Sequence, residues 1–172
     1  GVASSNGHSI QVRTGMGLIN QSFKDIDLGE LRGNIAVAHT RYSTTGSNKI
    51  DNAQPILSSN DGNEIALAHN GNVVNARELR QELVERGVKF TSSNDSEVIA
   101  HVLTTAPGST WADRFKYSMQ RLKGAYSLAV MTPSTLIAIR DPRGVRPLCI
   151  GKLKDGWVVA SESCALDHIG AS

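Results

Sequence analysis

The stretch EIALAHNGN, from Glu64 to Asn72, contains the transition on which our interpretation of the fold rests. Its first seven residues form a short apolar run, long enough for a β-strand and too short for a helix. The Asn70-Gly71 pair that follows is typical of a hairpin turn, but the residues after it have helical periodicity. We therefore expect a strand that bends into a helix and exposes the Asn70 side-chain amide and the Gly71 backbone N–H. A plain turn is the alternative.

The helix after this bend is predicted at 75–86. Leu79 and Leu83 share one of its faces, and charged residues occupy the others. Asn75 and Glu78 have the spacing of a capping box, which would satisfy free backbone N–H groups at the start of the helix. The pattern thus predicts an amphipathic helix with one face in the core.

Two further helices are predicted, one from Asn94 to the residue before Pro107 and one from Ser109 to about Lys123. Glu97 stands at the capping-box position relative to Asn94. The apolar residues of each helix share one face and are expected in the core: Val98, Ile99, Val102 and Leu103 in the first, and Trp111, Phe115, Met119 and Leu122 in the second.

Strands are predicted on both sides of these helices. Upstream, 34–40 is a second short apolar run. Downstream, four short runs are separated by turn residues, which favours antiparallel hairpins: 125–131, 135–140, 147–150 and 157–160. Strands, then helices, then hairpins indicate an α+β fold rather than repeated βαβ units.

Composition excludes several classes of protein. The 172 residues suit one domain, with 40% hydrophobic and 20% charged residues, and a formal charge of +2 gives no reason to expect nucleic acid or a membrane surface as partner. No apolar run has membrane-spanning length, and no signal peptide opens the chain.

Cys149 and Cys164 form no CxxC pair and are expected as small buried hydrophobes in a reducing compartment. The five histidines are scattered, so no metal site is predicted. Both ends look cut, and we interpret the chain as an internal fragment.

Three polar groups stand at the ends of predicted elements. Arg41 follows a strand, where its guanidinium could clamp a carboxylate through two parallel hydrogen bonds; a surface salt bridge is the alternative. Asn70 and the Gly71 N–H could form an oxyanion hole. Asp95 lies in the first turn of a helix, either as counter-charge for an ammonium group or as a local stabiliser of the helix terminus, worth about 0.3–1 kcal/mol.

In this order, the motifs resemble the glutaminase domain of class II glutamine amidotransferases, a group of N-terminal-nucleophile hydrolases. The matching segments cover essentially the whole chain: 15–18 with Phe23, HTRYSTTG at 39–46, AHNGN at 68–72, NDSEV at 94–98, RDPRGVRPL at 140–148 and SESCALD at 161–167. The resemblance implies a four-layer αββα sandwich, truncated here at both ends, with residues 1–172 forming a partial domain. RYSTTG and GVRPL favour the branch of the family that passes ammonia to phosphoribosyl pyrophosphate in the first step of purine (IMP) synthesis.

The resemblance also implies roles for individual residues. Arg41 would bind the α-carboxylate of glutamine, with Thr44 lining the same pocket, and Asp95 would bind the α-ammonium. Asn70 and the Gly71 N–H would stabilise the oxyanion. In the family an N-terminal cysteine attacks the side-chain amide, and its own α-amino group acts as base and acid. That cysteine is absent from this chain, so we predict that the isolated fragment is inactive.

The remaining expectations concern the parent protein. The resemblance implies glutamine as substrate, a phosphoribosyltransferase domain in cis that is not present here, a homo-oligomer and a cytoplasmic location. No cofactor is expected in the fragment; Mg²⁺ with phosphoribosyl pyrophosphate, and in some members an iron–sulfur cluster, would belong to the missing part. Two alternatives stay open: the glutaminase half of glucosamine-phosphate synthase or asparagine synthetase, and a catalytically inactive module that binds glutamine.

Overall fold

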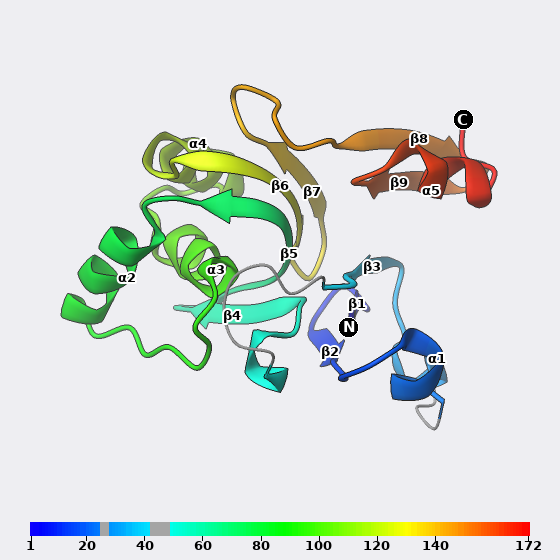
Figure 1. The fold of residues 1–172 in the computed structure, drawn as a ribbon, viewed down its shortest axis with the longest axis horizontal. Coiled ribbons are helices and arrows are strands. Elements are labelled where there is room, and N and C mark those ends of the chain that lie inside the picture. The colour runs from blue at the N-terminus through cyan, green and yellow to red at the C-terminus, as the bar shows by residue number, and fades with distance from the viewer. Residues whose placement is uncertain (25–27, 42–48) are drawn as a thin grey trace.

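The computed structural model describes residues 1–24, 28–41 and 49–172, and its centre is a four-stranded antiparallel sheet (Figure 1). The strands lie in the order β4-β5-β6-β7, with bounds Ile56–Asn60, Asn63–Val73, Gly124–Met131 and Leu136–Arg140. β5 and β6 share eight residue pairs, from Ala66 opposite Met131 to Val73 opposite Gly124. This long pairing makes β5 the strand around which the other elements are placed.

A second antiparallel sheet packs on one face of the central sheet. It has the order β2-β1-β3, with bounds Ile10–Arg13, Val2–Ser5 and Ile35–Ala38. Buried side chains from both sheets meet between them: Ala3, Ile10 and Val37 from one, and Ala66, Ala68 and Met131 from the other. These side chains are mostly small, so the two sheets can approach closely.

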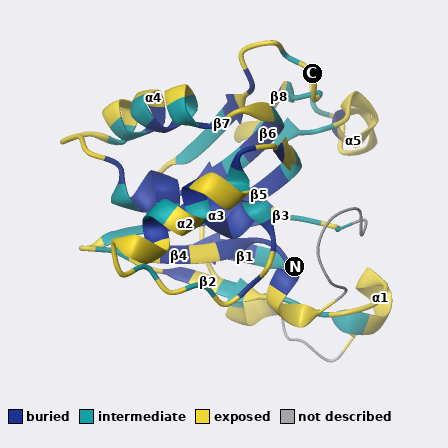
Figure 2. Cartoon of the chain, turned by 60° about the vertical axis from the view of Figure 1, so that its left-hand side comes forward, coloured by how far each residue is buried: buried dark blue, intermediate teal, exposed yellow. Residues whose placement is uncertain are grey.

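Three helices cover the opposite face of the central sheet: α2 (Ala76–Glu85), α3 (Asp95–Thr105) and α4 (Trp111–Arg121). The main core lies under them, where the buried side chains of α3 meet those of β5 and β6. Figure 2 colours much of α3 and β5 as buried. The predicted inward residues of the second and third helices all belong to this core, so the helical periodicities are confirmed. Helices, central sheet and second sheet give three stacked layers among the described residues.

β5 has two different faces because side chains alternate along a strand. Ile65, Leu67 and Val73 point into the core under the helices, whereas Ala66 and Ala68 point toward the second sheet. His69 continues the first series and Asn70 the second. Neighbouring residues of one motif therefore lie on opposite faces of the sheet.

The chain ends in a two-stranded sheet, β8 (Cys149–Leu153) and β9 (Gly156–Ala160), against which α5 (Ser163–His168) packs. The remaining elements are short: α1 (Ile19–Ser22) and the 3₁₀ helices Leu28–Glu30 and Ile50–Asn52. None of the helices in the described part of the chain has both the length and the apolar character needed to cross a lipid bilayer.

The expected bend at Asn70-Gly71 is wrong in its position. β5 runs on through both residues to Val73, and the helix starts only at Ala76. The reason is β6, which continues to pair with this part of β5, with Gly71 opposite Tyr126. A turn signal in the sequence is thus overridden by a strand partner more than fifty residues away.

Three smaller expectations are also corrected. Asn75 precedes α2 but makes no capping bond, because its side chain bonds Arg121 O and Lys123 N across the fold. Cys149 is partly exposed and Cys164 is exposed, so neither is buried. The predicted hairpin of 135–140 with 147–150 does not form either: β7 and β8 belong to different sheets, whereas the hairpins β6–β7 and β8–β9 are confirmed.

Candidate functional site

A polar pocket of about 300 Å³ lies where the end of β3, the middle of β5 and the start of α3 meet. Its volume is at the lower end of the range for small-molecule sites. Four of the five predicted site residues line it: Arg41, Asn70, Gly71 and Asp95. The fifth, Thr44, lies outside the described residues. The structure therefore gathers residues from three separate motifs into one cavity, which we call the polar pocket.

The Gly71 N–H leaves β5 at the edge that faces the pocket. The His69 N–H donates to Gln54 Oε1 at 2.7 Å, and the Val73 N–H donates to Asp95 Oδ2 at 2.9 Å, so both point away from β6. N–H directions alternate along a paired strand, and Gly71 stands between these two residues. β4 pairs with β5 only as far as Leu67 and does not cover Gly71. The N–H that the sequence predicts as an oxyanion donor therefore points away from β6, and it belongs to a strand and not to a bend.

Only glycine fits at position 71. Its φ is +157°, and a Cβ would overlap the Ala125 carbonyl oxygen on β6. The same Cβ would lie 2.7 Å from Tyr126 Cα and 2.8 Å from His69 Nε2. The close approach of β6 on one side and the imidazole on the other explains the requirement for a residue without a side chain.

Asp95 joins α3 to β5. Its Oδ2 accepts the Val73 N–H, and its Oδ1 lies 3.7 Å from His69 Nδ1. Ser96 Oγ lies 3.1 Å from the same imidazole nitrogen. The Asp95 side chain is 15% exposed, so the carboxylate is held from one side and open to the pocket on the other.

A hydrogen-bonded loop positions the start of α3. Asn94 caps the helix by accepting the Glu97 N–H at 3.0 Å. The Glu97 carboxylate does not return to Asn94, as a full capping box would require; it accepts the N–H and hydroxyl groups of Thr91 and Ser92 at 2.7–2.9 Å. Burial would raise the pKa of Glu97, but these four hydrogen bonds outweigh it and lower the pKa.

Two histidines of the pocket are held neutral by burial. Burial lowers the pKa of His39 to about 4, assisted by the positive charges of the Gly1 ammonium and Arg41. Burial also lowers the pKa of His69; the Asp95 carboxylate acts in the opposite direction, and Arg146 adds to the lowering. The sequence showed these histidines only as parts of motifs, and their burial could not be read from it.

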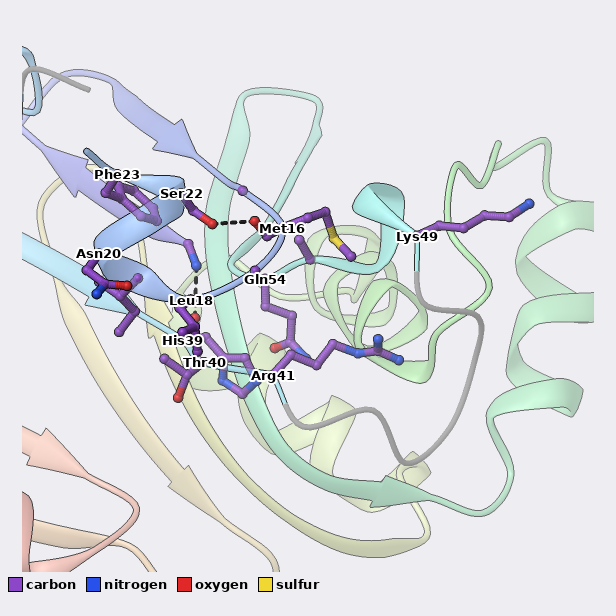
Figure 3. Close-up of a pocket in the computed structure, with 15 residues that line it drawn as sticks. Met16, Leu18, Asn20, Ser22, Phe23, His39, Thr40, Arg41, Lys49 and Gln54 are labelled. Carbon is purple, nitrogen blue, oxygen red and sulfur yellow. Dashed lines mark hydrogen bonds between the residues drawn. The ribbon is translucent and has the colours of Figure 1, made fainter. Parts of the chain in front are cut away.

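Arg41 follows β3 and lines two adjoining cavities. One is the polar pocket, and the other is a larger, mainly apolar cavity of about 630 Å³ that also involves the loop around Met16 and Leu18 (Figure 3). Gln54 and His39 also line both cavities. Arg41 thus stands where the two cavities meet, as a residue that anchors one end of an elongated ligand would.

Sequence reasoning missed several residues of the pocket, above all Gln54 and Arg146. Gln54 pairs with the His69 backbone through its amide, donating to the carbonyl at 3.5 Å as well as accepting the N–H. Arg146 reaches the pocket from the segment after β7. Neither cysteine is among the described residues that line the polar pocket, and no group of three or more His, Cys, Asp or Glu residues in the described ranges could hold a metal ion.

Comparison with known proteins defines the class. The family model of the glutamine amidotransferase domain matches residues 39–168, and the chain belongs to this family. Similar curated proteins are amidophosphoribosyltransferases. The Bacillus subtilis protein is 42% identical over 174 residues, covering 100% of this chain and 36% of that protein. The Synechococcus elongatus protein is 44% identical over 177 residues, covering 99% and 36%. The chain thus spans about a third of the length of these relatives.

Solved structures agree with this assignment. Glutamine phosphoribosylpyrophosphate amidotransferase from B. subtilis, complexed with ADP and GMP, superimposes with a TM-score of 0.91 and 40% identity, over 99% of this chain and 37% of that one. A second structure, described as the allosteric regulatory enzyme of purine biosynthesis, gives a TM-score of 0.90 and 41% identity over the same shares. The expected fold, that of the N-terminal-nucleophile hydrolases, is confirmed, and the described residues form three of its four expected layers.

Proposed function

We propose that the chain is the glutamine-hydrolysing part of an amidophosphoribosyltransferase. The whole protein would convert glutamine, water and phosphoribosyl pyrophosphate into phosphoribosylamine, glutamate and pyrophosphate. The observation that carries the proposal is the convergence of Arg41, Asn70, Gly71 and Asp95 on one polar pocket. The relatives described above bear this enzyme's name, which favours it over a glucosamine-phosphate or asparagine synthase.

In the proposed reaction the pocket holds both ends of glutamine. Arg41 binds the α-carboxylate and Asp95 the α-ammonium. A thiolate bonds to the side-chain amide carbon, and the carbonyl electron pair moves to oxygen, where Asn70 and the Gly71 N–H bind it. As the carbonyl re-forms, the C–N bond breaks, and the nitrogen takes a proton and leaves as ammonia. Water then cleaves the thioester to give glutamate.

Neither Cys149 nor Cys164 suits the role of nucleophile, because neither lines the polar pocket. We infer that the thiolate comes from another part of the whole protein, as does the phosphoribosyltransferase domain, and that residues 1–172 form part of the glutaminase domain. A homo-oligomer and a cytoplasmic location belong to the same proposal, as does Mg²⁺ with the phosphoribosyl substrate. Two free cysteines, one partly exposed and one exposed, suit a reducing compartment.

The test uses the full-length protein and two nitrogen sources. Asn70→Ala removes a donor to the oxyanion, so the glutamine-dependent kcat should fall by roughly 10²–10³. The same variant should keep its activity with free ammonia, which bypasses the pocket. If both activities fall equally, Asn70 supports the fold and not glutamine hydrolysis. If neither changes, the pocket is not the site of amide hydrolysis.

A further inference from the structure

The six residues 141–146, which follow β7, form an unusually well-bonded turn that we call the Asp141 turn. Asp141 is only 3% exposed. Its carboxylate accepts the N–H groups of Arg143 at 3.0 Å, Val145 at 3.1 Å and Arg146 at 3.3 Å. It also accepts the Tyr126 N–H of the neighbouring strand at 3.4 Å. Burial would raise the pKa of Asp141, but these backbone hydrogen bonds lower it, so the carboxylate stays charged.

The carbonyl of Arg146 is held as firmly as its N–H. Arg140 Nε donates to it at 2.6 Å, and Ser127 Oγ donates to it at 3.2 Å from β6. Arg140 also donates to the Gly144 carbonyl at 2.6 Å. Both backbone polar groups of Arg146 are therefore fixed relative to the central sheet, which also carries Asn70.

Two observations place the Arg146 side chain at the polar pocket. It lines the pocket together with Asn70, Gly71 and Asp95. Its charge also acts on the imidazole of His69, which lies on the pocket floor, and lowers the pKa of that ring. The turn thus directs a second guanidinium, besides that of Arg41, toward the cavity.

The described charged groups that line the pocket outnumber the two charged ends of glutamine. Its described ionisable groups are Arg41, Arg146, Asp95, His39 and His69. The histidines are neutral near pH 7 because their pKa values are lowered. With Arg41 proposed for the α-carboxylate and Asp95 for the α-ammonium, the guanidinium of Arg146 is the remaining described charge at the pocket. Glutamine is a zwitterion without net charge. The tetrahedral oxyanion and the product glutamate each carry one additional negative charge.

We propose that Arg146 provides a positive charge for the anion that forms at the side-chain end of glutamine, and that the Asp141 turn is its positioning element. The inference rests on the proposed function. A charge that matches the oxyanion better than the neutral amide favours the transition state over the substrate and so raises kcat. It also binds the γ-carboxylate of glutamate, to which a guanidinium donates two parallel hydrogen bonds.

The experiment compares Arg146→Gln with Arg143→Gln in the full-length protein. Arg143 lies in the same turn, is exposed, and does not line the pocket. For Arg146→Gln we expect a kcat with glutamine lower by roughly tenfold or more and an inhibition constant for glutamate higher by a similar factor, with a smaller change in KM. Ammonia-dependent activity should persist. Arg143→Gln should leave all four quantities unchanged.

Two further variants separate charge from structure. Arg146→Lys keeps the positive charge but lacks the planar guanidinium with its parallel N–H donors. Its kcat with glutamine should lie between that of Arg146→Gln and that of the unchanged protein. Asp141→Asn loosens the turn and should shift kcat and glutamate inhibition in the same direction as Arg146→Gln. Unchanged glutamate inhibition in Arg146→Gln would overturn the inference, as would an equal loss of ammonia-dependent activity. A different result would contradict the proposed function itself: an Asn70→Ala variant whose glutamine-dependent kcat is unchanged.

Discussion

The Asp95 carboxylate accepts the Val73 N–H at 2.9 Å, and this bond ties the first turn of α3 to the far end of β5. Gly71 lies between Val73 and His69, whose imidazole faces the other oxygen of the same carboxylate at 3.7 Å. The group proposed to bind the substrate ammonium is therefore anchored on the strand that carries Gly71, the proposed donor to the oxyanion. A shift of α3 would therefore affect the positions of Asp95 and of the Gly71 N–H together.

Asp95→Asn tests the charge of this group without removing its acceptor. The amide oxygen can still accept the Val73 N–H, so the fold should be kept. The loss of a charged hydrogen bond of about 1.5–3 kcal/mol should raise the KM for glutamine by roughly 10- to 100-fold, with little change in kcat. 4-Carbamoylbutanoate, which is glutamine without its α-amino group, supplies the control. The variant and the unchanged protein should use it equally; if the variant is equally impaired with it, Asp95 does not bind the ammonium.

Gly71→Ala should destabilise the protein by at least about 2 kcal/mol, because overpacking against β6 is added to a strained backbone angle. Gly62 in the β4–β5 turn is the matched control. Its φ is +79°, but a Cβ there would meet no atom within 4 Å. Gly62→Ala should therefore cost only about 1 kcal/mol, from the backbone angle alone. Thermal unfolding of both variants measures the difference, and equal costs would show that the contact with β6 is not tight.

The parts of the fold that depend on local pattern were predictable. The inward faces of α3 and α4 follow from helical periodicity, and the first part of β5 follows from its short apolar run. Other features depend on partners far away in the sequence. Asn75 looks like a helix cap, but its side chain is engaged by the segment at 121–123. Similarly, pairing with β6 extends β5 past Asn70, and no residue near Asn70 in the sequence indicates this pairing.

The residues of the site also divide into those that a local sequence pattern indicates and those that distant contacts position. Arg41, Asn70, Gly71 and Asp95 were found because each stands in a recognisable motif. Arg146 also stands in a matching segment, 140–148, but no role was predicted for it, because the Arg-Asp-Pro-Arg-Gly part of that segment has the composition of a simple hairpin turn. Its direction is set by the buried Asp141 carboxylate and by contacts with β6. The cysteines were misjudged for a related reason: apolar neighbours in the sequence do not reveal that Cys149 lies partly exposed in a two-stranded sheet.

Glu97 should make stability depend on pH in the acid range. Its pKa is lowered in the folded state, so its contribution is complete above the ordinary glutamate pKa of about 4.3 and is lost as the pH falls through the folded value. Glu97→Gln places an amide donor against N–H and hydroxyl donors and should cost about 2 kcal/mol at pH 7. The difference from the unchanged protein should shrink below about pH 4. Glu78→Gln, on the exposed side of α2, should change stability by less than about 0.5 kcal/mol at either pH.

Arg41 is expected to hold the α-carboxylate equally in the ground state and the transition state. Removing such uniform binding raises KM and leaves kcat nearly unchanged. Arg41→Lys keeps the charge but loses the planar fork, so the KM for glutamine should rise by roughly tenfold, while Asn70→Ala acts mainly on kcat. Steady-state kinetics of the full-length protein with glutamine and with ammonia distinguish the two patterns. A fall in kcat for Arg41→Lys that matches that of Asn70→Ala, with KM unchanged, would mean that Arg41 acts at the reacting amide, and the orientation proposed for glutamine would have to be reversed.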